Sequence, residues 1–315
     1  MTGKAVRARR GTGPGCRCTR MFVRIRSIGL SLFLVAAAAI ALGTLESCYF
    51  SLTDLFAESS AVTDRVKDTG ARSLATLPSG IESAPAASFL VVGDPHFGAS
   101  WAAGSDVLDG FASLAKARNP AFVMYAGDDA DGGTESQFKN FSDWASTVVD
   151  SGGSQIPWFS AVGNHDLYNG GWTYFRTYIG PSFYHLNVAG FTIYVIDTGQ
   201  GTLGNYQISR LRSEFAADPN PKIVVSHYPI YGGASVLYYY RLANPREQAE
   251  LLELFAQSKV KLIIAGHYHY LVHENVGAFD EWLVESLTVK DGGSTHCFSI
   301  TLKNDGTVSL SRIAF

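Results

Sequence analysis

Five apolar, strand-like runs in this chain each end at a short polar cluster, and this arrangement constrains the fold more than any other feature. In chain order the clusters are Gly93-Asp94-Pro95-His96, Gly127-Asp128-Asp129-Ala130-Asp131, Gly163-Asn164-His165-Asp166, His227 and Gly266-His267-Tyr268-His269. Open α/β sheets place their chemistry at the carboxyl ends of their strands. Because aspartate, asparagine and histidine are metal-ligating residue types, we interpret the clusters as a dinuclear metal centre at one sheet edge.

The segments between the clusters favour an α/β fold class. Apolar residues recur at helical spacing over residues 105–118 and 206–215. Two more helices are predicted from their starts, because Thr134 and Gln137 have capping-box spacing and Asn244 precedes a proline. Hairpin turns are expected near residues 189–190 and at 305–306, and the last quarter of the chain is mainly strands. The pattern predicts mixed sheets flanked by helices.

The charge of the chain is divided unevenly. The formal net charge is −3, yet residues 1–48 hold eight Lys/Arg and one acid, so the remainder carries −10. An acidic body argues against a nucleic-acid polymer as partner, since phosphate backbones need a basic surface. A small phosphate ester stays compatible with it, because bound metal ions reverse the local sign.

Residues 1–48 have the composition of an export leader. A basic start from Met21, which is an alternative initiation site, precedes the uncharged residues 27–45. This order is typical of a secretory signal, and the basic flank predicts an exported body. Two outcomes stay open: Cys48 is lipidated after cleavage, or the stretch remains as a membrane anchor, being just long enough to span. Either outcome tethers the protein to a membrane on its extracytoplasmic side.

The rest of the chain divides into two parts in this interpretation. Residues 49–86 are rich in Ser, Ala and Thr with weak periodicity, so they are predicted to be a tether or linker. The globular domain that holds the five clusters is predicted to span residues 87–315.

The ligand types of the clusters suit a specific chemistry. Two divalent cations about 3.5–4 Å apart can clamp the attacking and leaving oxygens of an in-line displacement at phosphorus. Such a centre needs a bridging carboxylate, and a water shared by both ions becomes hydroxide, which is the nucleophile. Imidazole suits Zn and Fe, while carboxylate and amide oxygens also admit Mn. The sequence therefore predicts metal-dependent hydrolysis of phosphate esters.

Taken together and in order, the five clusters resemble the motifs of the calcineurin-like metallophosphoesterases: G-D-x-H, G-D-x-x-D, G-N-H-D, H and G-H-x-H. The resemblance covers about residues 88–315. It implies a four-layer αββα sandwich of two mixed β-sheets. It also implies two divalent or mixed-valence metal ions, with Mn, Fe or Zn as candidates.

The resemblance assigns roles by position. The first metal would be bound by Asp94, His96, Asp128 and His269, and the second by Asp128, Asn164, His227 and His267. Asp128 would bridge the ions. His165 would be the acid that assists the leaving group, Asp166 would orient it by a hydrogen bond, and Asp131 would be an outer support. Purple acid phosphatases carry a tyrosine at the position of Asp131, so a tyrosinate-bound ferric centre is not expected.

Three functions follow from these observations and stay open at the level of sequence. The first is hydrolysis of phosphate monoesters. The second is a phosphodiesterase acting on cyclic nucleotides or phospholipid headgroups, and the third is a catalytically inactive binding lipoprotein with the same fold.

The two forms of membrane tether are distinguished by one substitution. Cys48→Ser should release the protein from membranes if Cys48 carries a lipid, because the single attachment point is lost. Fractionation of cells expressing either form measures this. A Cys48→Ser protein that stays in the membrane fraction would favour the uncleaved anchor instead.

Overall fold

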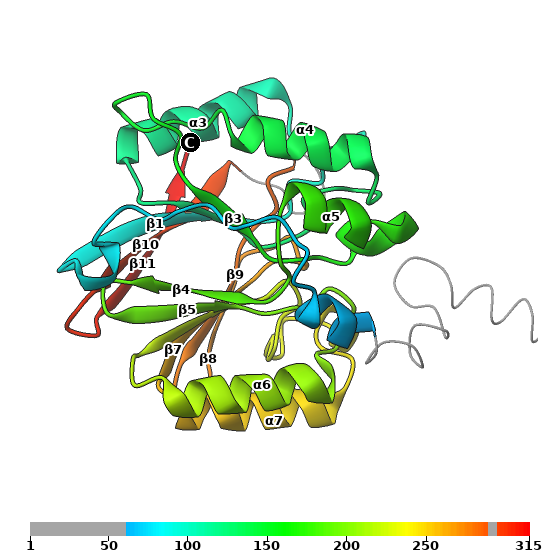
Figure 1. Cartoon of the computed structure of the whole chain (residues 1–315), viewed down its shortest axis with the longest axis vertical. Helices are drawn as coiled ribbons and strands as arrows, with labels where there is room; N and C mark the ends of the chain where they lie inside the picture. The colour runs from blue at the N-terminus through cyan, green and yellow to red at the C-terminus, as the bar shows by residue number, and fades with distance from the viewer. Residues whose placement is uncertain (1–60, 289–294) are drawn as a thin grey trace, which may run out of the picture. The chain divides into compact units, whose positions relative to one another are not determined.

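The computed structural model describes residues 61–288 and 295–315, and within them the strands form two mixed sheets (Figure 1). The first sheet has the order β11-β10-β1-β2-β3. Its strands are β1 (Ala86–Val92), β2 (Val123–Tyr125), β3 (Trp158–Ser160), β10 (His296–Lys303) and β11 (Val308–Ala314). β1, β2 and β3 run parallel, while β10 is antiparallel to both of its neighbours.

The second sheet has the order β4-β5-β6-β7-β9-β8. Its strands are β4 (Tyr184–Val188), β5 (Phe191–Val195), β6 (Lys222–Val225), β7 (Val260–Ala265), β8 (Val272–Asn275) and β9 (Asp280–Leu283). β5, β6, β7 and β9 are parallel, and the outer strands β4 and β8 pair antiparallel. The hairpin predicted near residues 189–190 joins β4 to β5, and the one at 305–306 joins β10 to β11.

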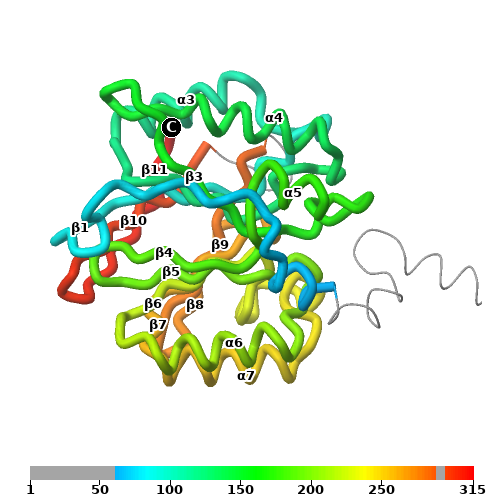
Figure 2. The backbone as a smooth tube through the Cα atoms, in the orientation of Figure 1, coloured from blue at the N-terminus to red at the C-terminus, as the bar shows by residue number. Residues whose placement is uncertain are grey.

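Helices cover the outer face of each sheet. The first sheet is covered by α3 (Ser105–Arg118), α4 (Glu135–Ala145) and α5 (Trp172–Tyr178), and the second by α6 (Gly204–Ala217) and α7 (Pro245–Gln257) (Figures 1 and 2). The described residues also contain three short 3₁₀ turns: η1 (Ile81–Ser83), η2 (His165–Gly170) and η3 (Tyr238–Tyr240). The predicted αββα sandwich is confirmed.

The helices begin where their capping residues predict. The backbone N–H of Thr134 donates to Oε1 of Gln137 at 3.3 Å, which is one half of a capping box. At α7, Oδ1 of Asn244 accepts from the N–H of Arg246 at 3.0 Å, and Pro245 occupies the first helical position. These local bonds satisfy backbone donors that have no partner within the helix.

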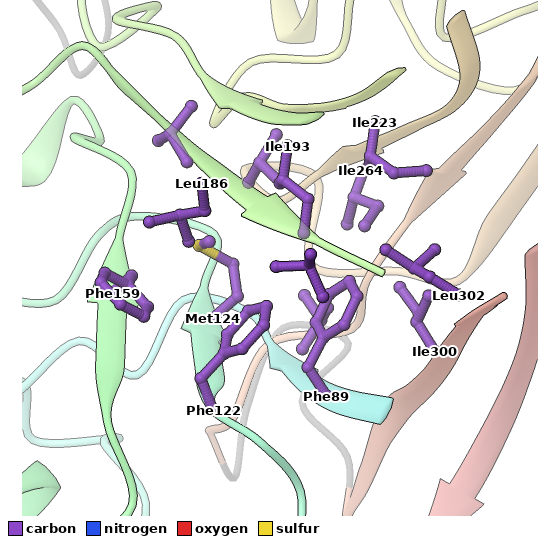
Figure 3. Packing of buried hydrophobic residues seen from close by; sticks show 14 of the residues in the cluster. Phe89, Phe122, Met124, Phe159, Leu186, Ile193, Ile223, Ile264, Ile300 and Leu302 are labelled. Carbon is purple, nitrogen blue, oxygen red and sulfur yellow. The ribbon is translucent and has the colours of Figure 1, made fainter. Parts of the chain in front are cut away.

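The central core lies between the two sheets. Phe89 and Val91 of β1 pack there, while Leu90 and Val92 of the same strand pack against the helices. Figure 3 shows residues of both sheets meeting in this core, among them Phe122 of the first sheet. Because both faces of the sheets are covered where the clusters begin, the last residues of β1, β2, β6 and β7 are buried at every position, which explains the continuous apolar runs before the polar clusters.

The predicted tether is wrong for the part of it that the structure describes. Residues 61–67 are helical, and Val62 and Val66 are buried in the cluster beneath α6 and α7. The Arg65 guanidinium donates to both carboxylate oxygens of Asp197 at 2.8 and 3.0 Å, and both residues are buried. The folded unit therefore includes residues before Ala87. Sequence periodicity missed this because the partner Asp197 is 132 residues away.

The leader and the first part of the tether lie in residues 1–60, outside the described residues. Among the residues that are described, no helix has the length and apolar character needed to cross a membrane.

Replacing Arg65 with alanine should lower the free energy of unfolding by about 3–5 kcal/mol, because Asp197 stays buried without its partner. Lys139→Ala is the control, since its ion pair with Asp143 is exposed and should contribute little. Urea denaturation followed by circular dichroism measures both. Equal, small losses in the two variants would contradict the view that residues 61–67 belong to the folded unit.

Candidate dinuclear metal centre

The polar clusters meet because they all follow parallel strands of the two sheets. Asp94 and Asp128 follow β1 and β2 of the first sheet, and Asn164 follows β3. His227 and His267 follow β6 and β7 of the second sheet. The carboxyl ends of both sheets therefore deliver these side chains to one edge of the sandwich.

One group of possible ligands contains His96, Asp128 and His269. Nε2 of His96 lies 3.2 Å from Nε2 of His269 and 3.6 Å from Oδ2 of Asp128. One ligand atom from each residue falls within 4.8 Å of the others. Two imidazoles and a carboxylate at this spacing suit a transition-metal ion or Mn²⁺.

A second group contains Asp128, His227 and His267. Nε2 of His227 lies 3.2 Å from Oδ2 of Asp128 and 3.2 Å from Nδ1 of His267. Oδ1 of Asn164 is 3.0 Å from the same Nε2. Asp128 belongs to both groups, so it stands at the position that a bridging carboxylate would occupy. The donor set of the two groups together fits two divalent cations.

Asp94 lies among the buried groups of the centre, next to His227 and His267. In the described residues it is a member of neither ligand group. Its carboxylate accepts from the backbone N–H of His267 at 3.0 and 3.2 Å, and its Oδ1 is 3.4 Å from Nδ1 of His227. The amide of His267 holds the Asp94 carboxylate on the side of the second group.

The backbone of the centre is strained at the positions of its proposed ligands. Five of the seven have positive φ: Asp94 at 38°, His96 at 45°, Asp128 at 53°, His267 at 66° and His269 at 64°. Each such residue costs roughly 1–3 kcal/mol and persists only where its surroundings hold it. Strain of this kind clusters at functional sites, which supports a site here beyond the residue types themselves.

Glycine is required at one close approach beside the bridge. A Cβ added at Gly163 would lie 2.2 Å from Oδ1 of Asp128, closer than any real contact. The glycine therefore allows the third cluster to approach the carboxylate of the second. The backbone N–H of His165 donates to the same Oδ1 at 2.8 Å.

Burial and neighbouring charges shift the pKa values of the acids and imidazoles in the centre. Burial raises the pKa of Asp94 to about 8 against the opposing charge of His227. Burial also acts to raise the pKa of Asp128, but the charges of His227 and His165 hold it well below its ordinary value. Burial, followed by the charge of His96, lowers the pKa of His269 to about 3. A neutral imidazole beside an ionised carboxylate is the state in which both groups bind metal.

Asp166 does not orient His165, and that prediction is wrong. Nδ1 of His165 donates to the backbone carbonyl of Asp131 at 2.7 Å. The carboxylate of Asp166 instead accepts from the N–H groups of Ala130 and Gly163, both at 2.9 Å. Asp166 is fully buried, so its oxygens take the two amides that the converging loops leave without a strand partner. Asp166 thus joins the second and third clusters.

Asp131 is nearer to the centre than an outer support implies. Its Oδ1 lies 3.3 Å from Nδ1 of His96 and 3.5 Å from Nδ1 of His165. These three residues form a third group with metal-ligand spacing. A hydrogen bond from His96, together with the charges of His165 and His96, lowers the pKa of Asp131.

Sequence analysis missed Thr198 as a support of the centre. Its Oγ1 accepts from the backbone N–H groups of His227 and Tyr228, each at 3.0 Å. Thr198 follows β5 and is adjacent to Asp197, the partner of Arg65. Its only sequence signal is a polar residue after an apolar run, a signal that many loops share.

A match to a protein-family sequence model identifies the family of the chain, and the matched residues include all five clusters. The sequence model described as calcineurin-like phosphoesterase matches residues 87–271, more than half of the chain. The chain belongs to the calcineurin-like phosphoesterase family. The family is one of metal-dependent phosphoester hydrolases, so this chain is assigned to that class. A comparison with curated protein sequences found no match.

Solved structures share the fold at low identity. GAP50, the anchor in the inner membrane complex of Plasmodium, has a TM-score of 0.55 at 17% identity, covering 73% of this chain and 85% of its own. A dimetal phosphatase from Danio rerio has a TM-score of 0.54 at 13% identity, covering 74% and 100%. The purple acid phosphatase PPD1 from yellow lupin has 0.53 at 13% identity, covering 76% and 53%.

Adding Mn²⁺ should stabilise the wild-type protein, because a metal that binds only the folded state shifts the unfolding equilibrium. At a hundredfold excess over Kd the gain is about 2.7 kcal/mol, which raises Tm by roughly 5–10 °C. Asp128→Asn should lose most of this shift, whereas Asp143→Asn on exposed α4 should keep it. Differential scanning fluorimetry with and without a chelator measures it. Equal Mn²⁺ shifts in the two variants would contradict the bridging position of Asp128.

Proposed function

We propose that the chain is a phosphatase that hydrolyses small phosphate esters with two divalent metal ions, Asp128 bridging them and His165 protonating the leaving oxygen. The observation that carries this proposal is the position of Asp128. Its carboxylate belongs to two ligand groups and also accepts from the N–H of His165. One residue thereby fixes the distance between the metal-binding side chains and the proposed acid.

The metal ligands proposed here are the seven named from the motifs, with Asp94 on the side of the second group. Cations bound there would neutralise the charge of the ester and activate a water for attack at phosphorus. Mn, Fe and Zn suit the mixture of imidazole, carboxylate and amide ligands. Asp131 beside His96 takes the place of a tyrosine, which supports divalent ions over a tyrosinate-bound ferric ion.

His165 is suited to proton transfer by its accessibility and by its hydrogen bond. Its side chain is 19% exposed, whereas that of His96 is 1% exposed, so His165 is within reach of a bound ester. The hydrogen bond from Nδ1 to the carbonyl of Asp131 fixes the ring and leaves Nε2 to carry the proton. A general acid must be oriented in this way before it can protonate a leaving alkoxide.

Asp166 and Thr198 act on the same chemistry through positioning. Asp166 ties the loop of Asp128 to the loop of His165 through two backbone amides. Thr198 holds the backbone at His227. Because neither side chain contacts a reacting atom in this proposal, their loss should loosen the geometry of the centre without removing a ligand.

His165→Ala should keep metal binding but slow turnover by about 10²–10⁴-fold, the usual contribution of a general acid. The control is His185→Ala, since His185 lies on β4 away from the clusters and is half exposed. The assay is hydrolysis of p-nitrophenyl phosphate and bis-p-nitrophenyl phosphate with Mn²⁺, alongside metal content. A His165→Ala protein that loses its metal together with its activity would refute the separate role for His165. If the wild-type protein hydrolyses neither ester in a metal-dependent way, the proposed function is wrong.

A further inference from the structure

Most of the exposed large apolar side chains in the described part of the chain gather at one place. In residues 61–288 and 295–315 they are Leu237, Tyr238, Tyr239, Tyr270 and Leu271, together with Tyr206 on α6. Tyr238 is 79% exposed and Tyr270 is 52% exposed. All but Tyr206 come from the loop after His227 and from the segment after His267, so both segments start at a proposed ligand of the second group.

These two segments form a continuous wall of rings, which we call the aromatic rim: Tyr238, Tyr239, Tyr240, Tyr268 and Tyr270. The ring of Tyr240 lies 5.7 Å from that of His267. Tyr239 is 4.5 Å beyond Tyr240, and Tyr238 is 5.6 Å beyond Tyr239. Tyr268 joins Tyr240 to Tyr270, with 5.4 Å between centroids on either side. The rim therefore leads from the metal centre outward to solvent.

The loop that carries the rim is fixed at its base. Glu281 of β9 is fully buried, and its carboxylate accepts from the N–H groups of Ile230 at 2.7 Å and Gly232 at 2.6 Å. The guanidinium of Arg241 donates to the carbonyl of Tyr231 at 3.0 Å, which ties the two ends of the loop. Hydrogen bonds from the loop amides to this buried carboxylate hold the loop in one conformation.

A second contact ties the two segments of the rim to each other. The hydroxyl of Tyr268 donates to the carbonyl of Ser235 at 3.0 Å. Gly233 has a φ of +61°, and a Cβ there would lie 2.0 Å from the Glu274 carboxylate, so this turn admits only glycine without rearrangement. The exposed rings are thus presented by a loop whose shape is already set before any ligand arrives, which reduces the entropy lost on binding.

We infer that the aromatic rim binds the leaving group of the substrate, and that the preferred substrates are phosphate esters whose leaving group carries a flat ring. This inference rests on the proposed function, because it takes the phosphoryl group to be held beside His267. A planar ring attached to that group would meet tyrosine faces and edges, and such pairs add to affinity beyond the area they bury. Tyrosine also offers a hydroxyl to polar edges of a heteroaromatic ring.

The observations favour a small ring-bearing ester over a membrane surface as the occupant. The rim begins at a proposed metal ligand, so its inner rings are within reach of a substrate bound there. The segments that carry the rim, residues 228–244 and 268–271, contain one Lys or Arg, which is Arg241, and its guanidinium donates to the carbonyl of Tyr231. Attraction to an anionic lipid surface needs several such charges.

The test is calorimetric binding of three phosphonates to the Mn²⁺-loaded protein: methylphosphonate, cyclohexylphosphonate and phenylphosphonate. None has a P–O bond to its organic group, so binding is measured without that group leaving. Wild type should bind phenylphosphonate more tightly than cyclohexylphosphonate by roughly 3- to 10-fold, because the two differ in planarity more than in size. Tyr239→Leu should remove most of this preference while leaving methylphosphonate affinity unchanged.

Two further variants make the comparison specific. Tyr206→Leu is the matched control, an exposed tyrosine outside the rim, and it should keep the phenyl preference. Tyr239→Phe keeps the ring and should keep the preference too. Circular dichroism of each variant verifies that it is folded.

Each outcome decides between the possibilities. Methylphosphonate binding with no phenyl preference in wild type would overturn the inference and leave the proposed function standing. Failure of all three phosphonates to bind would overturn both. An unchanged phenyl preference in Tyr239→Leu, with loss of binding to vesicles of anionic phospholipid, would overturn the inference in favour of a membrane-docking surface.

Discussion

The buried carboxylate of Asp128 is the interaction on which the rest of the site depends. It lies between an imidazole delivered by the second sheet and a backbone amide delivered by the first, at 3.2 Å from Nε2 of His227 and 2.8 Å from the N–H of His165. Both sheets must therefore hold a fixed separation and register. The shared core of residues such as Phe89 and Ile264 provides that constraint, since it fills the space between the two sheets.

The same constraint explains the strain around the ligands. Loops that leave parallel strands must turn at once to point their side chains inward, and five proposed ligands do so with positive φ. Glycine relieves the crowding where the backbones approach most closely, as at Gly163 beside Asp128. Buried carboxylates and imidazoles meet at this edge, and their donor set fits two divalent cations. The protein thus stores strain and charge at the edge where its motifs meet.

Local signals in the sequence predicted the helices and the residues of the metal centre. The features that were not predicted depend on contacts between residues that are distant in the sequence. The capping residues Thr134 and Asn244 predict helices because their bonds reach only two or three residues along the chain. The residues of the clusters follow from strand ends and family motifs. The hydrogen-bond partners of Asp166 were not predicted from the sequence. Two loop amides, rather than the imidazole of His165, donate to the Asp166 carboxylate. The packing of Arg65 was also hidden, since its buried partner Asp197 is distant in sequence.

The central claim is that Asp128 bridges two metal ions. The most direct test is anomalous diffraction at the Mn absorption edge from crystals of the Mn²⁺-loaded protein. The account predicts two anomalous peaks about 3.5–4 Å apart, with the Asp128 carboxylate between them and imidazoles of His96 and His227 on opposite sides. A single peak, or a pair of peaks of which neither contacts Asp128, would contradict it.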